Sequence, residues 1–547
     1  MKKYIYIIAL LATTGLQAQT LNVNNSDGSF LPFELKEVND ITFNETDKIV
    51  AVSFKNGVQH KFYTEAVESI SPNTDKSNRL TYNLTPTLAF DNNDKKNFNE
   101  IIEDIPKEET LDNDYGDYIE KYSVEKIVNI AFSENSVTVS GEGVTAIKYT
   151  KNGTHLTINS ESGKVGYIVS GKCSNGSLKI YSEKKFQIML AGVDLTNPKG
   201  PAINIQTGKT VYFTIDDNTT NKLCDGASYS AASNGEDQKG TIFSEGQLIF
   251  NGYEDGTGVL NVTSLGGHGI CSDDYIRIRS GNINIVKAAK DGFHTNDKFI
   301  VDRTAVASPK ITVNATNDGI DCGNGEVTIN AGTIELTTGG EGIKAASETS
   351  ITQNVTINGG YIKFTTTGNK SSGIKSVYAY KQTGGIIHGT VEGNGSKIIN
   401  CDKNITISGG KIIGFAKGTV LDENTLAGGI KCEGILEIQK GTIAIGCTGK
   451  GAKGINCNNI TIKDGDVTIL STAQNQIGAK TFPSIAIDTN NLTINKGSLK
   501  LKAYDNAISA NEVSIAKGKL HAISDNNIAI DATIAQSGGW ILTKENE

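Results

Sequence analysis

The chain has 547 residues, more than one ordinary globular core holds, so its length predicts several domains or one long array of repeats. The composition favours the array, because 60 glycines and only 8 prolines separate short runs of valine, isoleucine and threonine. Charged residues make up 20% of the chain, which argues against global disorder. The net charge of −8, without any basic tract, excludes nucleic acid as an expected partner.

Residues 1–18 have the pattern of a secretory signal peptide. Lys2 and Lys3 precede an apolar run over residues 4–12, and a small-residue cleavage site follows at residues 16–18. The run is too short to span a membrane, and no cysteine follows it for lipid anchoring. No later stretch is long and apolar enough for a membrane span. We therefore expect a soluble protein that is secreted or held at the cell surface.

Residues 19–75 are predicted to form a small β module of two hairpins. Their turns are expected at residues 26–29 and 55–57, where Asp-Gly and Asn-Gly pairs interrupt apolar alternation. This stretch resembles a short N-terminal segment of many exported proteins of Bacteroidetes-type bacteria. Residues 76–135 are polar and acidic and are predicted to be a linker, with one helix near residues 97–105.

Residues 136–547 repeat in units whose spacing, from the low twenties to the low thirties, is typical of solenoid coils. Each unit begins with an anchor, a glycine followed by isoleucine or phenylalanine. A second short strand follows the anchor, and a third follows a glycine turn, as at Gly332. Three strands per coil predict an all-β fold, a parallel β-helix in which equivalent residues stack about 4.8 Å apart. The clearest anchor glycines are Gly269, Gly292, Gly319, Gly342, Gly373, Gly429 and Gly454.

Two columns of residues are predicted to point inward. The residue after the anchor glycine is large and apolar, and the residue three positions after it is small, so alternation places both on the core side. The small column includes Cys322, Cys401, Cys432 and Cys457. We expect these cysteines to be buried free thiols rather than disulfides, because side chains stacked in one column point in the same direction.

The column two positions after the anchor is predicted to face solvent. It contains Cys271, His294, Asp321, Lys344, Lys375, Asn400, Lys431, Asn456 and Asp488. Stacked carboxylates around the coils of residues 268–342 repel one another unless a cation lies between them, and Ca²⁺ accepts such oxygen ligands. We expect one or more Ca²⁺ sites among Asp273, Asp274, Asp291, Asp297, Asp318, Asp321 and Glu341. The alternative is that these acids are solvated, metal-free turn residues before glycine.

His294, Lys344, Lys375 and Lys431 are the candidates for binding an anionic sugar. A lysine beside Ca²⁺ would have a lowered pKa and abstract a proton α to a uronate carboxyl, so a lyase that uses Lys344, Lys375 or Lys431 is an alternative. The plainest interpretation is that each lysine lies on a solvated face. A zinc site would need further ligands, because His268 and His294 belong to different columns.

Residues 136 to about 345 resemble a bacterial carbohydrate-binding family of parallel β-helices that is related in shape to pectate lyases. The resemblance implies a right-handed parallel β-helix, Ca²⁺ at the acidic turns, and binding of plant-type polysaccharide such as pectin or cellulose. His268 stands where an acid is usual, and Lys344 where a second acid is often found, so the number of Ca²⁺ ions stays open. The stretches that carry the resemblance are residues 221–226, 240–244, 269–274, 290–297, 317–321 and 341–345.

Three functions remain open at this point. The favoured one is a monomeric, non-catalytic, calcium-dependent protein that binds acidic or plant-type polysaccharide. The second is a calcium-dependent lyase of the pectate type. The third is a structural or adhesive surface protein, for which a long solenoid is sufficient. A fold alone does not decide among them.

Overall fold

The computed structural model describes residues 20–25, 30–44, 48–64, 67–73, 117–232, 235–304, 306–346, 354–478 and 480–544. The chain forms two compact units: residues 1–90 with residues 404–547, and residues 91–403. The expected signal peptide and the helix expected near residues 97–105 lie outside the described residues. No helix among the described residues is long and apolar enough to cross a membrane.

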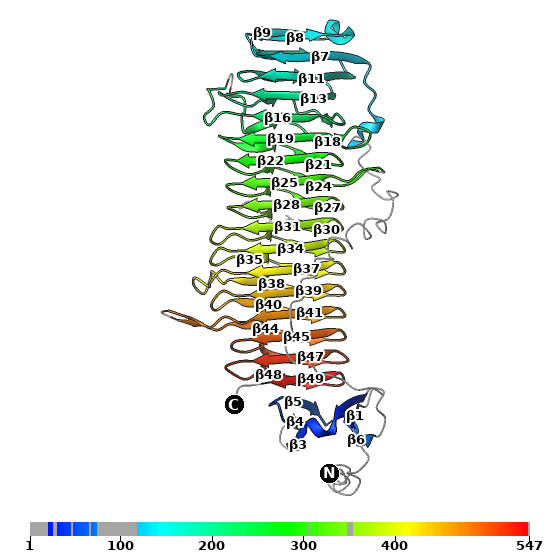
Figure 1. Ribbon diagram of the computed structural model, residues 1–547, viewed down its shortest axis with the longest axis vertical. Coiled ribbons are helices and arrows are strands. Elements are labelled where there is room, and N and C mark those ends of the chain that lie inside the picture. Colours follow the sequence, from blue (N-terminus) through cyan, green and yellow to red (C-terminus); the bar gives the residue numbers. More distant parts are fainter. Residues whose placement is uncertain are drawn as a thin grey trace. The chain divides into compact units, whose positions relative to one another are not determined.

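The unit of residues 91–403 is a parallel β-helix, as the sequence predicted, and equivalent strands of successive coils pair into sheets (Figure 1). The anchor sheet contains β10 (His155–Ser160), β12 (Ser177–Ser182), β14 (Ile203–Ile205), β17 (Gly240–Ser244), β20 (His268–Ser272), β23 (Phe293–Thr295), β26 (Ile320–Cys322), β29 (Ile343–Ala345), β32 (Ile374–Ser376) and β35 (Lys397–Cys401). The second sheet contains β15 (Val211–Ile215), β18 (Leu248–Gly252), β21 (Tyr275–Ile278), β24 (Lys298–Val301), β27 (Glu326–Ile329), β30 (Asn354–Ile357) and β33 (Ala379–Gln382). The third contains β16 (Thr220–Cys224), β19 (Val259–Ser264), β22 (Asn282–Ala288), β25 (Lys310–Ala315), β28 (Thr333–Thr338), β31 (Tyr361–Thr366) and β34 (Ile386–Val391).

The solenoid begins before residue 136, the start expected from the sequence. β7 (Lys126–Ser133) buries Val128, Ile130 and Phe132 on one face and pairs in parallel with β11 (Val165–Cys173). This period-2 alternation is strand material, so the linker assignment of residues 76–135 was wrong for its last part. The other elements of this end are η3 (Ile119–Lys121), β8 (Ser136–Ser140), η4 (Glu142–Ala146), β9 (Lys148–Asn152) and β13 (Phe186–Thr196).

Glycine is required at the anchors and at the turns for different reasons. A Cβ atom on Gly319 would lie 2.6 Å from the backbone oxygen of Gly342 in the next coil, closer than van der Waals contact allows. At the turn before the third strand, Gly332 has a φ of 92°, a conformation that side chains disfavour. The repeat of glycine in the sequence therefore reflects the close stacking of coils and the geometry of one turn.

The two inward columns are confirmed. Ile270, Phe293 and Ile320 are fully buried, and so are Ser272 and Cys322 of the small column. In the other unit Cys432 stacks in register with Cys457, and the thiol of Cys432 is free, as expected. Stacking places these sulfur atoms on the same side of their strands, where they fill space rather than cross-link.

The unit of residues 1–90 and 404–547 contains further coils of the same kind. Here the first two strands of most coils run together into one longer strand, which leaves two strands per coil. The longer strands are β38 (Gly428–Ile438), β40 (Lys453–Ile462), β44 (Ile485–Ile494), β46 (Ile508–Ile515) and β48 (Ile530–Gln536). The others are β36 (Asn404–Ile407), β37 (Lys411–Ala416), β39 (Thr442–Cys447), β41 (Asp466–Ser471), β42 (Gln476–Ile477), β43 (Thr481–Phe482), β45 (Ser498–Ala503), β47 (Lys519–Ser524) and β49 (Trp540–Lys544).

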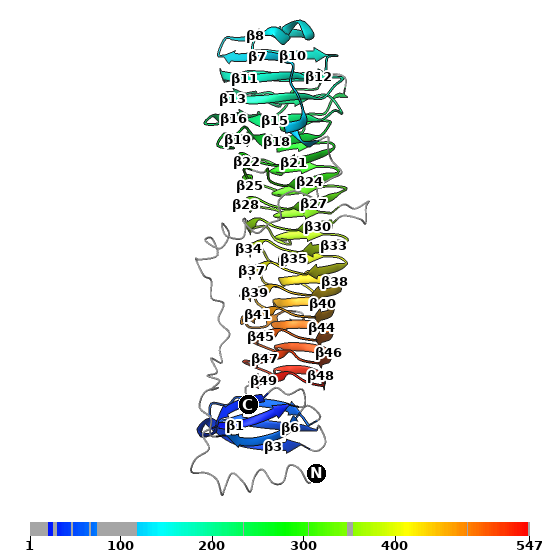
Figure 2. The ribbon, with the colours of Figure 1, turned by 90° about the vertical axis from the view of Figure 1, so that its right-hand side faces the viewer.

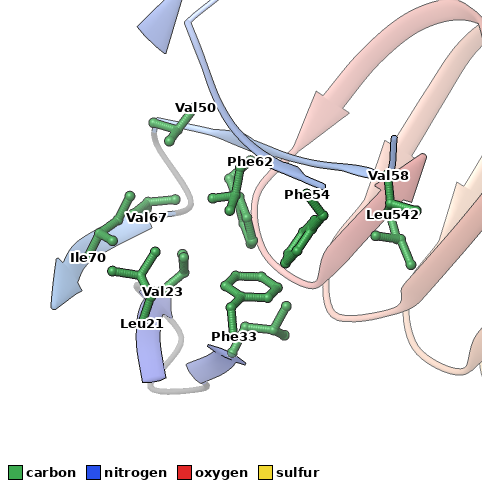
Figure 3. Packing of buried hydrophobic residues seen from close by; sticks show 12 residues of the cluster. Leu21, Val23, Phe33, Val50, Phe54, Val58, Phe62, Val67, Ile70 and Leu542 are labelled. Atoms are coloured by element: carbon green, nitrogen blue, oxygen red, sulfur yellow. The ribbon is translucent and has the colours of Figure 1, made fainter. Parts of the chain in front are cut away.

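The N-terminal module of this unit contains the two predicted hairpins and additional pairing. Its elements are β1 (Thr20–Asn25), β2 (Phe30–Glu34), η1 (Leu35–Glu37), β3 (Val38–Asn44), β4 (Ile49–Phe54), β5 (Gln59–Tyr63) and β6 (Val67–Asn73). β1 pairs with β2 and β6, and β4 pairs with β3 and β5. β5 also pairs antiparallel with β49, and Leu542 joins the module's core beside Phe33, Phe54 and Phe62 (Figure 3). The module thus covers the edge of the last strand, which would otherwise be open to pairing with another chain.

Candidate functional site

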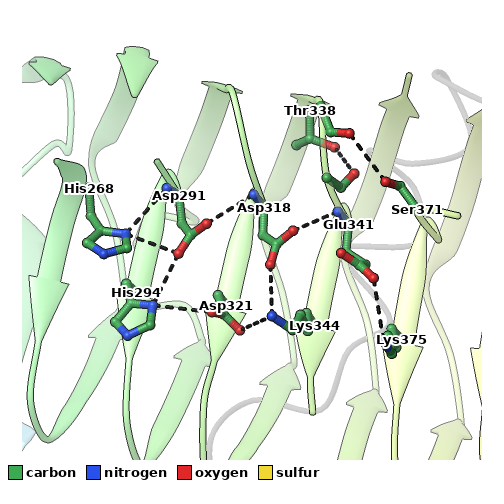
Figure 4. A network of polar contacts seen from close by, with 12 residues as sticks. His268, Asp291, His294, Asp318, Asp321, Thr338, Glu341, Lys344, Ser371 and Lys375 are labelled. Atoms are coloured by element: carbon green, nitrogen blue, oxygen red, sulfur yellow. Dashed lines mark hydrogen bonds and ion pairs between the residues drawn. The ribbon is translucent and has the colours of Figure 1, made fainter. Parts of the chain in front are cut away.

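A row of acidic side chains precedes the anchors of the coils between residues 268 and 341. Asp291 and Asp318 each accept a hydrogen bond from the backbone N–H of the corresponding residue in the next coil. Asp318 N donates to Asp291 Oδ1 at 3.1 Å, and Glu341 N donates to Asp318 Oδ1 at 2.8 Å (Figure 4). His268 Nδ1 accepts from Asp291 N in the same way, at 3.3 Å. These side chains therefore stabilise the stacking of the turns, and they also place several carboxylates next to one another.

The column two positions after the anchor lies beside this row, in the predicted register. His294 pairs with Asp321, Asp321 with Lys344, and Lys344 with Lys375. The two columns exchange ion pairs: Lys344 Nζ lies 3.1 Å from Asp318 Oδ2 and 3.4 Å from Asp321 Oδ1. Lys375 Nζ lies 3.7 Å from Glu341 Oε1. We call these two adjacent columns, from residue 268 to residue 375, the charged ladder.

The histidines of the charged ladder flank one carboxylate. His268 Nδ1 and His294 Nδ1 lie 3.0 and 3.2 Å from Asp291 Oδ2, and His294 Nδ1 also lies 3.3 Å from Asp321 Oδ2. The two imidazole rings stack with their centroids 4.4 Å apart. His268 was not among the predicted site residues, although its position before an anchor glycine was a usable signal.

Burial and charge shift the pKa values of this cluster in opposite directions. Burial by itself would lower the pKa of His294, but its contacts with Asp291 and Asp321 raise it to about 9. Burial would raise the pKa of Asp291, but its close contacts with the His268 and His294 rings hold it well below its usual range. Burial and then Glu341 raise the pKa of Asp318; the Lys344 ammonium opposes this shift but is shared with Asp321. Asp318 and Asp321 therefore share a single ammonium group, that of Lys344.

The protonation of His294 gives a testable pH dependence. Its folded pKa of about 9 exceeds the ordinary 6.5, so its contribution to stability is complete below pH 6.5 and is lost as the pH rises through about 9. In calcium-free buffer we expect the free energy of unfolding to lose on the order of 2 kcal/mol over this window. Urea denaturation at a series of pH values should show this loss in the wild type and a flatter profile in His294→Gln. His155→Gln, which changes a histidine outside the charged ladder, should keep the wild-type slope; equal slopes in all three would contradict the assignment.

The carboxylates of the charged ladder fit a divalent cation. Asp291, Asp318 and Asp321 are all buried and offer oxygen atoms within 4.8 Å of one another. Asp321 Oδ1 is buried and accepts no hydrogen bond among the described residues, although Lys344 Nζ lies nearby. Oxygen ligands in a flexible arrangement are those that Ca²⁺ prefers. Glu341 lies beside Asp318, on which it acts electrostatically.

Three of the predicted metal ligands belong to other surroundings. Asp273 pairs with Lys239 at 2.6 Å, a lysine that lies outside the predicted columns. Asp274 accepts a hydrogen bond from Gln247, and burial, followed by repulsion from Asp297, raises its pKa. These acids are therefore separate from the group formed by Asp291, Asp318 and Asp321. Their partners lie in neighbouring coils, where sequence spacing gives no side-chain direction.

The outward column is more buried than the sequence predicted, and Cys271 is the clearest correction. Cys271 is fully buried, and burial raises the pKa of its thiol. Tyr229, from the segment between β16 and β17, lies close enough to Cys271 to interact with it electrostatically. Lys431 belongs to the other unit, where its Nζ lies 3.5 Å from Glu433 Oε1.

Residues 117–125, which were assigned to the linker, instead lie along the outer face of the second sheet, and we call them the strap. Figure 2 shows the strap (cyan) running over the coils of β15 and β18. Its Asp117 Oδ2 lies 3.0 Å from Arg277 Nη1, and Asp302 Oδ2 lies 2.6 Å from Arg277 Nε. Arg279 pairs with Glu120 at 2.6 Å and lies 4.3 Å from the ring centre of Tyr118. These arginines were not predicted as site residues, because Asp117 and Arg277 are 160 positions apart in the sequence.

The fold and the charged ladder define a β-solenoid protein with a row of partly buried ionic side chains along one of its sheets. The model of the carbohydrate-binding domain-containing protein family matches residues 152–471, and the chain belongs to this family. The match extends beyond residue 345, where the resemblance read from the sequence ended.

Two further comparisons place limits on the likeness to known proteins. No curated protein matches the chain. A solved structure of a polysaccharide lyase-like protein from C. thermocellum, a gadolinium derivative, is similar at 22% identity and a TM-score of 0.35. The similarity covers 57% of this chain and 96% of that chain.

Proposed function

We propose that the protein is a secreted, non-catalytic, calcium-dependent carbohydrate-binding protein that recognises acidic or plant-type polysaccharide such as pectin. The observation that carries this proposal is the cluster of Asp291, Asp318 and Asp321, whose oxygens lie within 4.8 Å of one another in a member of a carbohydrate-binding family. Secretion is inferred from the N-terminal sequence pattern of residues 1–18.

Charge explains why a cation belongs in the proposal. The protein has a net charge of −8, so by itself it repels a polyuronate. Bound Ca²⁺ would neutralise the cluster and accept carboxylate oxygens of a uronate as further ligands. Asp291, Asp318 and Asp321 would hold the ion, with Glu341 beside them. Lys344 occupies the space between Asp318 and Asp321, so its ammonium has to move aside.

The lysines of the charged ladder fit binding better than catalysis. A general base needs a pKa near the working pH. Burial would lower the pKa of Lys344, but Asp318 and Asp321 raise it above its ordinary value, which keeps the side chain protonated. A protonated Lys344 displaced from the acids, together with Lys375 and His294, can donate hydrogen bonds to an anionic sugar. Lys431 would make a comparable contact in its own unit.

The proposal is tested by incubating the full-length protein with polygalacturonate, with and without Ca²⁺. Two quantities are followed: retardation of the protein in an affinity gel and absorbance of unsaturated uronides. We expect Ca²⁺-dependent retardation and constant absorbance. Rising absorbance would make the protein a lyase and would direct attention to Lys344, Lys375 and Lys431. No retardation on polygalacturonate or on a neutral glucan would leave a structural or adhesive role.

A further inference from the structure

A groove of about 400 Å³ lies on the outer face of the second sheet, beside the strap. Its floor comes from adjacent coils: Gln187 of β13, Thr214 of β15 and Asn251 of β18. Thr214 and Asn251 are neighbours in register across the sheet. The strap contributes one wall, with Ile119, Glu120, Tyr122 and Val124. The rest of the lining consists of Gly252, Tyr253, Glu254, Thr304 and Val306.

The floor of the groove presents polar groups from a rigid sheet. Gln187 Nε2 donates to Thr214 Oγ1 at 2.7 Å, which leaves the threonine hydroxyl hydrogen for another acceptor. Asn251 is only 3% exposed, and its Oδ1 has no hydrogen-bond partner among the described residues. A buried amide oxygen without a donor costs free energy, and a ligand hydroxyl would relieve it after a rotation of the amide. This unpartnered group points to a ligand rather than to packing alone.

The walls of the groove combine aromatic and acidic side chains. Tyr122 is held by a hydrogen bond from its hydroxyl to Lys185 O at 2.7 Å and by its ring contact with Tyr212, whose centroid is 4.7 Å away. Tyr253 lines the groove and is 47% exposed, so its ring is accessible to a ligand there. Tyrosine rings pack against apolar faces while their edges stay polar. The strap itself is fixed by the ion pair between Glu120 and Arg279, so the groove exists before any ligand arrives.

The charge of the groove selects among ligands. Glu254 lines it together with Glu120, whose charge is paired with Arg279, and no lysine, arginine or histidine is among its described lining residues. Carboxylates accept hydrogen bonds from hydroxyl groups but repel anions, so a uronate is disfavoured here. Amide, hydroxyl and carboxylate groups below and between aromatic rings are complementary to a sugar ring, which has hydroxyl groups at its rim and C–H groups on its faces. We propose that this groove is a subsite for a neutral sugar residue of a polysaccharide, distinct from the charged ladder and independent of Ca²⁺.

The test uses the full-length protein with cellohexaose, xylohexaose, mannohexaose and trigalacturonate, titrated calorimetrically in the presence of EDTA. We expect at least one neutral hexasaccharide to bind without Ca²⁺ and trigalacturonate not to bind. Tyr253→Ala should weaken neutral-sugar binding about tenfold, since aromatic anchors dominate such contacts. Tyr378→Ala is the matched control, because Tyr378 is 51% exposed and does not line the groove.

The outcomes separate this subsite from the calcium proposal. Absence of binding to all three neutral hexasaccharides, or equal affinities of the wild type and Tyr253→Ala, would overturn the subsite. Asn251→Leu supplies a second variant, checked first for an unchanged melting temperature, and is expected to lose affinity in the same direction. Variants of the charged ladder that lose Ca²⁺-dependent polygalacturonate binding but keep neutral-sugar binding would show that the groove and the charged ladder bind their ligands independently.

Discussion

Replacing Arg277 with methionine is expected to lower the free energy of unfolding by about 3–5 kcal/mol. The guanidinium of Arg277 lies between Asp117 and Asp302, and the three side chains are only 4%, 5% and 2% exposed. Removing the cation leaves two buried carboxylates without their cationic partner. A buried charge without a counter-charge costs more free energy than the loss of an ion pair at the surface. The midpoint of urea denaturation, followed by tyrosine fluorescence, measures the change.

Two comparison variants sharpen this result. Lys363→Met breaks a pair with Glu335 whose side chains are 45% and 40% exposed and 3.9 Å apart, so its effect should stay below about 0.5 kcal/mol. Arg277→Lys keeps the charge but loses the planar guanidinium that reaches both carboxylates. Its loss of unfolding free energy should lie between those of Arg277→Met and Lys363→Met. Limited proteolysis should cut the strap faster in Arg277→Met. A midpoint shift no larger than that of Lys363→Met would refute a structural role for this pair.

Replacing both Asp318 and Asp321 with asparagine is expected to reduce Ca²⁺ affinity by roughly 100-fold, equivalent to about 2.7 kcal/mol. The substitution removes two negative charges but keeps the size of the side chains, so the stacking of the coils is preserved. Calorimetric titration of Ca²⁺ measures the affinity directly. Retardation by polygalacturonate should fall in parallel if the ion joins the sugar to the protein.

Replacing Lys344 is expected to change Ca²⁺ affinity in the opposite direction. Its ammonium competes with a cation for Asp318 and Asp321, so Lys344→Met should increase Ca²⁺ affinity. Asp464→Asn, which changes an exposed acid paired with Lys496, is the matched control and should leave Ca²⁺ binding unchanged. Ca²⁺ affinity that is the same in the wild type, the double variant and Lys344→Met would mean that the ladder acids are turn residues without a metal.

The solenoid and its columns could be predicted from the sequence because stacking in register is periodic. Ile270, Phe293 and Ile320 recur at one position of each coil, and each is buried in the structure. The same register brought His294, Asp321 and Lys344 into one column, so the composition of the charged ladder was readable in advance. Glycine at the anchor followed from the approach of neighbouring coils, which the repeat itself imposes.

The tertiary structure alone decided which of these groups contact one another and what covers them. Pairing of Lys344 with Asp318 and Asp321 depends on side-chain direction between two columns, and Cys271 is fully buried although its column was predicted to face solvent. The strap lies beside Arg277, although Asp117 and Arg277 are 160 positions apart in the sequence. Likewise, β5 of the N-terminal module pairs with β49, which lies near the other end of the sequence. A local repeat specifies contacts between neighbouring coils, because each coil meets only the next. Contacts made by segments that leave the repeat have no such periodicity, and the groove beside the strap is one of their consequences.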